Sequence, residues 1–400
     1  MKKEQIILLI LACINFTHIT DFMIMMPLGP QLIRILGISP LQFSYLVSAY
    51  TFSAGITGFI AAFFVDKYDR KSLLLLGYVG FIVGTFACAF SPTYHLLLFS
   101  RILAGSFGGL IGAQVQSIVA DTFPFERRGK AMGTLMAAFS VASVVGVPLG
   151  LYFANLYNWQ FPFIIVGAVG VLIIPLVIIF IPSMKGHIQQ PEIKPGPFSV
   201  LTYILQDKNQ LRALLLTVCL TFAHFIIVPL LSPYMVANVG FTEHQLTYIY
   251  LVGGTLTIFS APLVGKLADK YGKHKVFTMF SYIALLPLFF ITNIGVVPIY
   301  IALTLTAGFF VFSGGRMIPS MALVSSVVAP QQRGSFMSIN SSFQQITTGM
   351  AAFIAGHIVT KSVEGPLENY NWIGYIAVAA SIICIVIARR LKPVSINAIV

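Results

Sequence analysis

Charged residues are scarce in this chain. Asp, Glu, Lys and Arg together make up 9% of its 400 residues, while 57% of the residues are hydrophobic. In soluble domains about a quarter of the residues are charged. A soluble globular protein is therefore excluded, and we expect an integral membrane protein that is in contact with the lipid bilayer along most of its length.

Other absences narrow the class further. The four cysteines lie in apolar runs without paired spacing, so we expect neither a disulfide framework nor a zinc site. No phosphate-cradling glycine loop ending in Gly-Lys-Ser/Thr occurs, which excludes an ATP-driven pump. The excess of basic residues gives a formal net charge of +12, but these residues form no patch interleaved with aromatics, so a nucleic-acid partner is not expected.

Long apolar runs dominate the remaining sequence. Unpaired backbone groups are costly in lipid, so runs of this length are expected to be helices. The sequence predicts an all-α membrane protein with twelve transmembrane helices, near residues 6–28, 41–64, 73–91, 96–120, 131–155, 161–181, 212–236, 245–267, 276–293, 298–322, 335–359 and 371–389.

The basic residues predict how these spans are oriented. With the N-terminus inside, twenty of the 24 Lys and Arg residues fall on the cytoplasmic side, as the positive-inside rule requires. We therefore expect a multi-pass membrane protein with both termini in the cytoplasm. A Pro- and Gly-rich stretch predicts a cytoplasmic linker at 183–211 between six-helix halves at 1–182 and 212–400.

Asp21 is the one acidic residue that lies well inside a membrane-length run. An ionised carboxylate there costs at least ~2.5–3.5 kcal/mol on insertion scales, so such residues usually face a bundle interior and mark an ion or substrate path. A proton-carrying or substrate-binding role is one interpretation. A structural salt bridge, or a polar cap at the Pro27 break, is the other.

The two halves repeat a loop sequence. After the second span comes AFFVDKYDRKS (62–72), and after the eighth comes GKLADKYGKHK (265–275), so that Asp66 and Asp269 are 203 residues apart. Arg128-Gly129 and Arg333-Gly334 repeat at an offset of 205. An internal duplication of this kind is typical of transporters whose site lies between two halves.

At these residues the chain resembles the major facilitator superfamily over essentially its whole length. The second loop is similar to the family signature Gly-x-x-x-Asp-x-x-Gly-x-basic-basic, whereas the first has Ala62 and Asp69 where glycines are expected. The resemblance implies two pseudo-symmetric six-helix halves. It also implies a gating role, in closing the cytoplasmic side, for Asp66, Arg70, Lys71, Gly265, Asp269 and Lys273.

Three further segments resemble twelve-span drug/proton antiporters of the multidrug or arabinose efflux permease type. Arg101 lies in LFSRILAG (98–105), in the place of an arginine linked to proton transfer. Asp21 begins an Asp-x(5)-Pro segment, and the fifth span carries a Gly/Pro-rich motif with Gly146, Pro148 and Gly150, interrupted by Val147. The resemblance implies proton-coupled efflux of a small amphipathic or organic solute across the bacterial inner (plasma) membrane, by a monomer without cofactors.

Asp21 and Arg101 are expected at matched depth. The aspartate lies about seven residues from the outer end of its span and the arginine about five, at 1.5 Å per residue. The pair could couple transport to protons, or it could be a permanent ion pair that only orients two helices. His18 shares the helix face of Asp21 and could relay protons, although a structural histidine is as compatible with the pattern.

The cavity is expected to draw residues from other spans. Arg316 lies in a span of the second half, which has no carboxylate inside its membrane segments, so it must meet a backbone carbonyl, water or an anionic group of the substrate. In the superfamily the first, fourth, seventh and tenth spans line the cavity, which implies the candidates Gln114, Met25, His224 and Arg316, with Gln345 ranked lower.

Alternatives to efflux remain open at this point. Proton-coupled uptake of a sugar or metabolite is the second hypothesis, supported by Val147 in the antiporter motif. A membrane-embedded enzyme is a distant third, because the sequence has no metal-ligand cluster and no paired carboxylates. The absence of charge rings, together with the duplication, argues against a channel. The protein is therefore predicted to be a carrier and not an enzyme.

Overall fold

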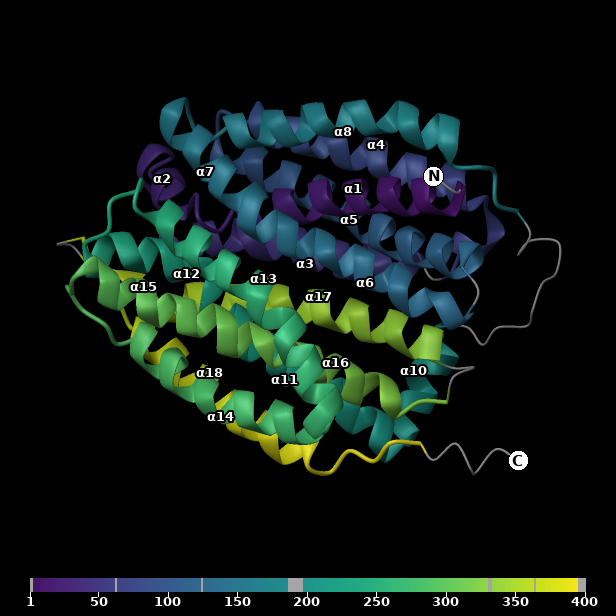
Figure 1. The fold of residues 1–400 in the computed structure, drawn as a ribbon. Helices are drawn as coiled ribbons and strands as arrows, with labels where there is room; N and C mark the ends of the chain where they lie inside the picture. The colour runs from purple at the N-terminus through teal and green to yellow at the C-terminus, as the bar shows by residue number, and fades with distance from the viewer. Residues whose placement is uncertain are drawn as a thin grey trace.

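The computed structural model describes residues 3–61, 63–123, 125–185, 197–329, 333–362 and 365–394. Its helices lie roughly along a common direction in two groups, purple to blue for the earlier part of the chain and green to yellow for the later part (Figure 1). α1 begins and α18 ends at the same end of the bundle, as an even number of spans requires.

The earlier group contains eight helices and two short helical turns. They are α1 (Lys3–Ile24), α2 (Gly29–Ile35), α3 (Pro40–Ala61), η1 (Val65–Lys67), α4 (Arg70–Ala89), α5 (Tyr94–Thr122), α6 (Phe125–Val141), η2 (Ala142–Gly146), α7 (Val147–Leu156) and α8 (Phe161–Phe180). The π-helical turn η2 joins α6 to α7 as one continuous span.

The later group follows α10 (Pro197–Gln206), a helix inside the predicted linker. It comprises α11 (Lys208–Phe225), α12 (Val228–Tyr234), η3 (Met235–Val239), α13 (Leu246–Tyr271), α14 (Lys273–Ile291), α15 (Ile299–Gly308), η4 (Phe309–Gly314), α16 (Met317–Ser326), α17 (Arg333–Ile358) and α18 (Tyr370–Ala388). A two-stranded hairpin of β1 (Thr360–Lys361) and β2 (Leu367–Glu368) joins α17 to α18. The positions of the domain boundaries themselves remain a prediction.

Eleven helices in the described residues are long and apolar enough to cross a membrane. α17 has 26 residues, which exceeds the length needed to span a bilayer core, but it is richer in Ser, Thr, Gln and Asn. It lies against α3 along much of its length. With α17 included, the twelve predicted spans are confirmed, each within a few residues of its predicted ends.

Helix ends follow local chemistry. α1 stops just before Pro27, and Pro30 occupies the first turn of α2, where a missing N–H costs nothing. Thr93 caps α5 and Asp207 caps α11 by accepting backbone N–H bonds. Gly240 ends η3 in the left-handed region at φ 92°. These ends fix where each span enters and leaves the apolar layer.

Glycines allow α5 to approach its neighbours closely. A Cβ at Gly105 would collide with the Tyr50 carbonyl oxygen, and one at Gly109 with that of Ala54, both on α3. On the next face, a Cβ at Gly84 of α4 would lie 2.7 Å from the Ala104 backbone. Small residues therefore bring the backbones of α3, α4 and α5 together, as expected for helix packing in lipid.

The two groups of helices meet along two seams. In one seam α3 packs against α17, where a Cβ at Gly349 would lie 2.9 Å from the Thr51 hydroxyl oxygen. In the other, α13 packs against η2 and α7, and a Cβ at Gly254 would lie 2.9 Å from Val144. Each seam therefore brings one helix of the earlier group into close contact with one helix of the later group.

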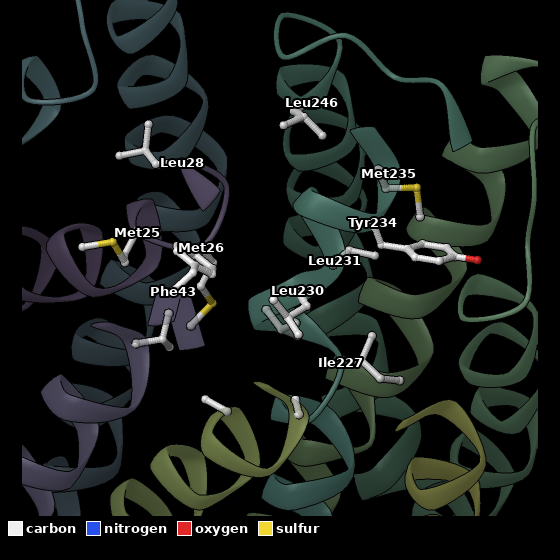
Figure 2. Close-up of a cluster of buried hydrophobic side chains, with 14 of the residues drawn as sticks. Met25, Met26, Leu28, Phe43, Ile227, Leu230, Leu231, Tyr234, Met235 and Leu246 are labelled. Carbon is white, nitrogen blue, oxygen red and sulfur yellow. The ribbon is translucent and has the colours of Figure 1, made fainter. Parts of the chain in front are cut away.

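Buried apolar side chains of both groups form a cluster at the end that holds α2 and the hairpin. Met25, Met26, Leu28 and Phe43 lie on one side of it, and Leu230, Leu231 and Met235 among others lie on the opposite side (Figure 2). The positive-inside distribution predicts that this end faces outward, and we call the cluster the outer seal. At its rim Arg34 forms a two-pronged ion pair with Glu243, at 3.1 and 3.0 Å.

Candidate transport site

A buried ion pair lies between α1 and α5. Arg101 donates from Nη1 to Oδ2 of Asp21 at 2.8 Å, and both side chains are fully buried. Thr85 of α4 donates its hydroxyl to the other carboxylate oxygen at 3.1 Å. The predicted meeting of Asp21 and Arg101 is confirmed, while its proposed role in moving protons remains a prediction.

The rest of the Arg101 guanidinium is held by an aromatic ring. Its carbon atom lies 4.2 Å from the centre of the Tyr50 ring, a cation–π distance. Nε and Nη2 are buried without a hydrogen-bond partner among the described residues. Leaving a buried donor unsatisfied costs about 1–3 kcal/mol, so these two donors favour any acceptor that reaches them.

His18 stands one helical turn before Asp21 and beside the same tyrosine. Its ring centre lies 6.1 Å from that of Tyr50 and 5.6 Å from that of Phe81. Its Nε2 atom has no hydrogen-bond partner among the described residues. The structure thus brings all three predicted proton-coupling residues into one neighbourhood, with His18 in contact with the ring that carries Arg101.

The predicted antiporter motif packs directly on this part of α1. A Cβ at Gly146 would lie 2.6 Å from the Thr20 hydroxyl oxygen, and one at Gly150 would lie 2.5 Å from Ile24. Pro148 occupies the first turn of α7, immediately after the π-helical turn η2. π-helical turns often occur at functional sites. Here η2 contacts Thr20, the residue before Asp21, on one side and α13 of the later group on the other.

The later group of helices also buries an arginine, but its hydrogen-bond partners are uncharged. Arg316, between η4 and α16, is fully buried and donates from Nη1 to the Ser381 hydroxyl at 2.8 Å and from Nη2 to that of Ser313 at 3.4 Å. Its Nε has no partner among the described residues. The partners are serine hydroxyls, which the sequence analysis did not consider, and no ion pair of Arg316 occurs within the described part of the chain.

His224 of α11 shares Ser313 with Arg316. Its Nδ1 lies 3.1 Å from the Ser313 oxygen, and its ring stacks on Phe309 with centres 5.0 Å apart and an interplanar angle of 8°. Phe309 and Ser313 both belong to the π-helical turn η4. The predicted cavity residues His224 and Arg316 therefore form one cluster.

Aromatic rings connect the two arginine clusters across the molecule. Tyr50, which carries Arg101, stacks on Phe22 at 5.6 Å, and Phe22 meets Phe225 at 6.2 Å. Phe225 lies edge-on to His224 at 5.1 Å. We call Tyr50, Phe22, Phe225 and His224 the aromatic bridge. Phe22 and Phe225 are half-buried and pack against the outer seal, so they form part of its inner boundary.

Sequence reasoning missed Tyr50, Phe22 and Phe225. The chain contains 34 Phe and 16 Tyr residues, so no single one stands out by type. Phe22 directly follows Asp21, and Phe225 directly follows His224. Adjacency to the two polar residues in membrane spans was the available signal.

Three other predicted cavity residues take different places. Gln114 of α5 is fully buried, and neither of its side-chain polar atoms has a partner among the described residues. Met25 is fully buried in the outer seal. Gln345 is half-buried at the α3–α17 seam, where a Cβ at Gly55 would lie 3.2 Å from its own.

The first gating loop is fastened inside its own group of helices. Asp69 caps α4 through the Lys71 N–H at 3.1 Å and accepts bonds of 2.7 Å from the Ser183 hydroxyl and the Met184 N–H. Arg70 donates from Nε to Asp121 at 3.2 Å. Burial acts to raise the pKa of Asp69, but those three bonds and the Lys185 charge outweigh it and lower that pKa overall. The side chain of Asp66 lies outside the described residues.

The second gating loop makes fewer contacts. Asp269 and Lys273 are exposed, and Asp269 has no hydrogen bond or ion pair among the described residues. Apart from its chain neighbours and its own helix backbone, no described atom lies within 4 Å of a Cβ built at Gly265, so this glycine makes no close contact with a neighbouring helix in the described part of the chain. Asp69, which departs from the family pattern, is thus more firmly held than Asp269.

Twelve apolar spans and duplicated loops are typical of a multi-pass membrane transporter. The family model described as Major Facilitator Superfamily matches residues 11–315 and, in a second match, 213–397. The chain belongs to the major facilitator superfamily.

Similar proteins agree with this assignment. The chain is 26% identical over 345 residues to the uncharacterized MFS-type transporter YceJ of Bacillus subtilis, a match that covers 85% of both chains. It is 24% identical over 370 residues, 91% of both chains, to the quinolone resistance protein NorA of Staphylococcus aureus. Its fold is similar to a bacterial homolog of the human lysosomal transporter Spinster in an inward-facing, unoccupied conformation, with a TM-score of 0.70, 12% identity and 97% coverage of both chains.

Proposed function

We propose that this protein exports a small amphipathic organic solute in exchange for protons across the bacterial inner membrane, as a monomer with both termini in the cytoplasm. The observation that carries the proposal is the fully buried Asp21–Arg101 pair at 2.8 Å. Removing one partner of such a pair leaves an unpaired charge in a low-dielectric site. Protonation of Asp21 has that consequence, so it changes the energy of the site sharply.

The surroundings of the pair support coupling to movement of the two halves. Asp21 follows Thr20, which meets Gly146 of η2, and η2 in turn packs on Gly254 of α13. A shift of α1 after protonation therefore reaches the seam between the halves through two consecutive contacts. These contacts are tight, because a Cβ added at Gly146 would lie within 3 Å of Thr20 and one at Gly254 within 3 Å of Val144.

The aromatic bridge offers a binding surface for the solute. Phe22 and Phe225 come from opposite halves and lie on the inner boundary of the outer seal. Aromatic walls with a few polar groups are typical of small-molecule sites, and His18 and His224 supply such groups at the two ends of the bridge. An amphipathic solute with a ring system suits this lining.

Efflux is favoured over uptake by the relative named for quinolone resistance. Closure of the outer seal, and the lack of a partner for Asp269 among the described residues, support a resting state that opens to the cytoplasm, from which an exporter loads its solute. The alternative, uptake by symport, moves solute and protons in the same direction, and the following experiment separates the two.

Everted membrane vesicles with an acidic interior test the proposal. Addition of norfloxacin or ethidium is expected to release protons from vesicles that contain the wild-type protein, seen as recovery of quenched acridine fluorescence, while the solute accumulates inside. Asp21→Asn should abolish both signals. Thr85→Val is the matched control. It removes one hydrogen bond to Asp21 but leaves the ion pair, so both signals should persist.

Two results would contradict the proposal. Proton release by Asp21→Asn at the wild-type rate would show that coupling lies elsewhere. Solute driven out of preloaded everted vesicles together with protons would identify a symporter instead.

A further inference from the structure

Within the described residues, no carboxylate balances the charge of Arg316. Of the acidic side chains in the later half, 212–400, Glu364 lies outside the described residues, and Glu243, Asp269 and Glu368 have no hydrogen bond or ion pair with Arg316. Glu243 is engaged with Arg34, Asp269 is exposed at the end of α13, and Glu368 lies in the β2 strand. An isolated charge in a low-dielectric interior is costly unless it is paired.

The contacts that Arg316 does make are few. Two serine hydroxyls accept bonds from Nη1 and Nη2, and the second of these is long, at 3.4 Å. Nε is fully buried without a partner among the described residues. A serine hydroxyl is a neutral acceptor, so these bonds satisfy donors but leave the positive charge in place.

Arg316 lies at the junction of η4 and α16, inside one continuous span, Ile299–Ser326. Its backbone N–H bonds to the Phe312 carbonyl oxygen, and its own carbonyl oxygen accepts the Ser320 N–H. The attraction for a negative group therefore comes from the guanidinium and not from a helix end.

We propose that the cluster of Arg316, Ser313 and His224 binds a monovalent anionic group, the carboxylate of the transported solute or a free anion. His224 is half-buried and belongs to the aromatic bridge, so an anion that approaches from the bridge meets His224 first. Beyond His224, the anion accepts a hydrogen bond from Nη2 of Arg316 in place of the 3.4 Å bond to Ser313. It accepts a second one from Nε, which has no partner among the described residues. The solute then places its rings on Phe22 and Phe225 and its acidic group at Arg316. The choice of solute in this inference rests on the proposed function, whereas the anion site does not.

Thermal unfolding of the purified protein in lipid nanodiscs tests the site without any transport step. 2-Naphthoate is expected to raise the unfolding temperature of the wild-type protein, and 2-naphthamide, which has the same rings and no charge, is expected to do so much less. Loss of a charge-assisted bidentate contact weakens binding by at least about tenfold. Arg316→Gln should therefore need about tenfold more naphthoate for the same shift.

Two controls keep the outcome clear. Arg316→Lys keeps the charge but not the planar fork, so it should retain part of the naphthoate effect. Arg389→Gln removes an exposed arginine of the same half, at the end of α18, and should respond to naphthoate as the wild-type protein does. Proton exchange by Asp21→Asn and naphthoate binding by Arg316→Gln are measured separately, so a failure of the proposed function and a failure of the anion site are distinguishable.

Exchange of chloride for gluconate distinguishes the two sources of the anion. Stabilisation by chloride that is lost in Arg316→Gln identifies a free inorganic anion as the occupant. Stabilisation by naphthoate alone identifies the acidic group of an organic solute. Equal shifts with naphthoate and naphthamide in the wild-type protein, together with no effect of chloride, would overturn the proposal, as would an unchanged naphthoate response in both Arg316 variants.

Discussion

Among the described residues, each half of this transporter buries one arginine inside a membrane span, and the two halves balance that charge differently. Arg101 has a carboxylate at 2.8 Å and an aromatic ring at 4.2 Å, so its cluster is neutral overall when Asp21 is ionised. The hydrogen-bond partners of the Arg316 side chain in the described part of the chain are serine hydroxyls, which leave its positive charge in place. The protonation state of Asp21 changes the first cluster, whereas a ligand from outside is needed to neutralise the second.

The difference suggests a division of labour between repeated halves. A carrier that exchanges a solute for protons needs one site whose charge depends on protonation and one that recognises the solute. The aromatic bridge lies between the two clusters and touches both. Occupation of one site can therefore alter the packing at the other through side chains that are already in contact.

The largest expected effect comes from breaking the neutral pair. Asp21→Asn strands a buried guanidinium and should lower the free energy of unfolding by about 3–5 kcal/mol. Adding Arg101→Met removes the stranded charge, so the double variant should recover most of that loss. Thermal unfolding of both variants in nanodiscs measures the difference.

Proton exchange measured on the same proteins separates structure from coupling. The double variant should be stable and still unable to exchange protons for solute. If it regains exchange together with stability, the pair serves only to hold α1 against α5. A double variant that is as unstable as the single one would indicate that the arginine itself, not its charge balance, supports the fold.

The second effect comes from making the later half resemble the earlier one. The Ser381 oxygen lies 2.8 Å from Nη1 of Arg316, so Ser381→Asp places a carboxylate beside the unbalanced charge. A hydrogen bond to a charged group contributes about 1.5–3 kcal/mol, and the unfolding temperature should rise accordingly. Naphthoate should then no longer stabilise the protein, because the site is already neutral.

Ser381→Asn is the matched control for size. It should leave the unfolding temperature nearly unchanged and keep the response to naphthoate. If Ser381→Asp lowers the unfolding temperature instead, the serines already provide all the compensation that Arg316 needs, and the contrast between the halves is not one of charge.

The sequence was sufficient for the spans and for one contact in the site. Twelve apolar runs, the basic loops and the duplication determine which segments cross the membrane. Asp21 and Arg101 could be paired because the rise of a helix fixes depth from position along a span. Depth alone, however, does not fix rotation. Which face of α1 and α11 turns inward depends on packing along their whole length, so the meeting of Phe22 with Phe225 could not be derived.

Departures of the backbone from regular α-helix also could not be predicted from the sequence. The π-helical turns η2 and η4 change the rotation of everything after them in a span, and a regular helical period misplaces residues such as Ser313. The role of Asp69 was missed for a different reason. Asp69 stands where the family signature has a glycine, and its partners Ser183 and Met184 lie 114 and 115 residues away in the chain, so no local pattern reveals these contacts.

The smallest expected effect concerns the two gating loops, which differ as the arginine clusters do. Asp69 accepts three hydrogen bonds, while Asp269 has no partner among the described residues. Loss of an N-cap costs about 0.5–2 kcal/mol, so Asp69→Ala should destabilise the protein by about 1 kcal/mol. Asp269→Ala should stay within about 0.5 kcal/mol of the wild-type protein.

The pH dependence of that difference identifies its cause. The pKa of Asp69 in the folded protein is below its ordinary value, so its carboxylate stabilises the fold at pH values above the ordinary aspartate pKa of about 3.9. This contribution is lost as the pH falls through the lowered folded value. Unfolding temperatures of wild-type protein and Asp69→Ala should therefore converge in strong acid and stay apart at neutral pH. A gap that is the same at every pH would mean that the side chain acts through its packing, and the contrast with Asp269 would then not be one of charge.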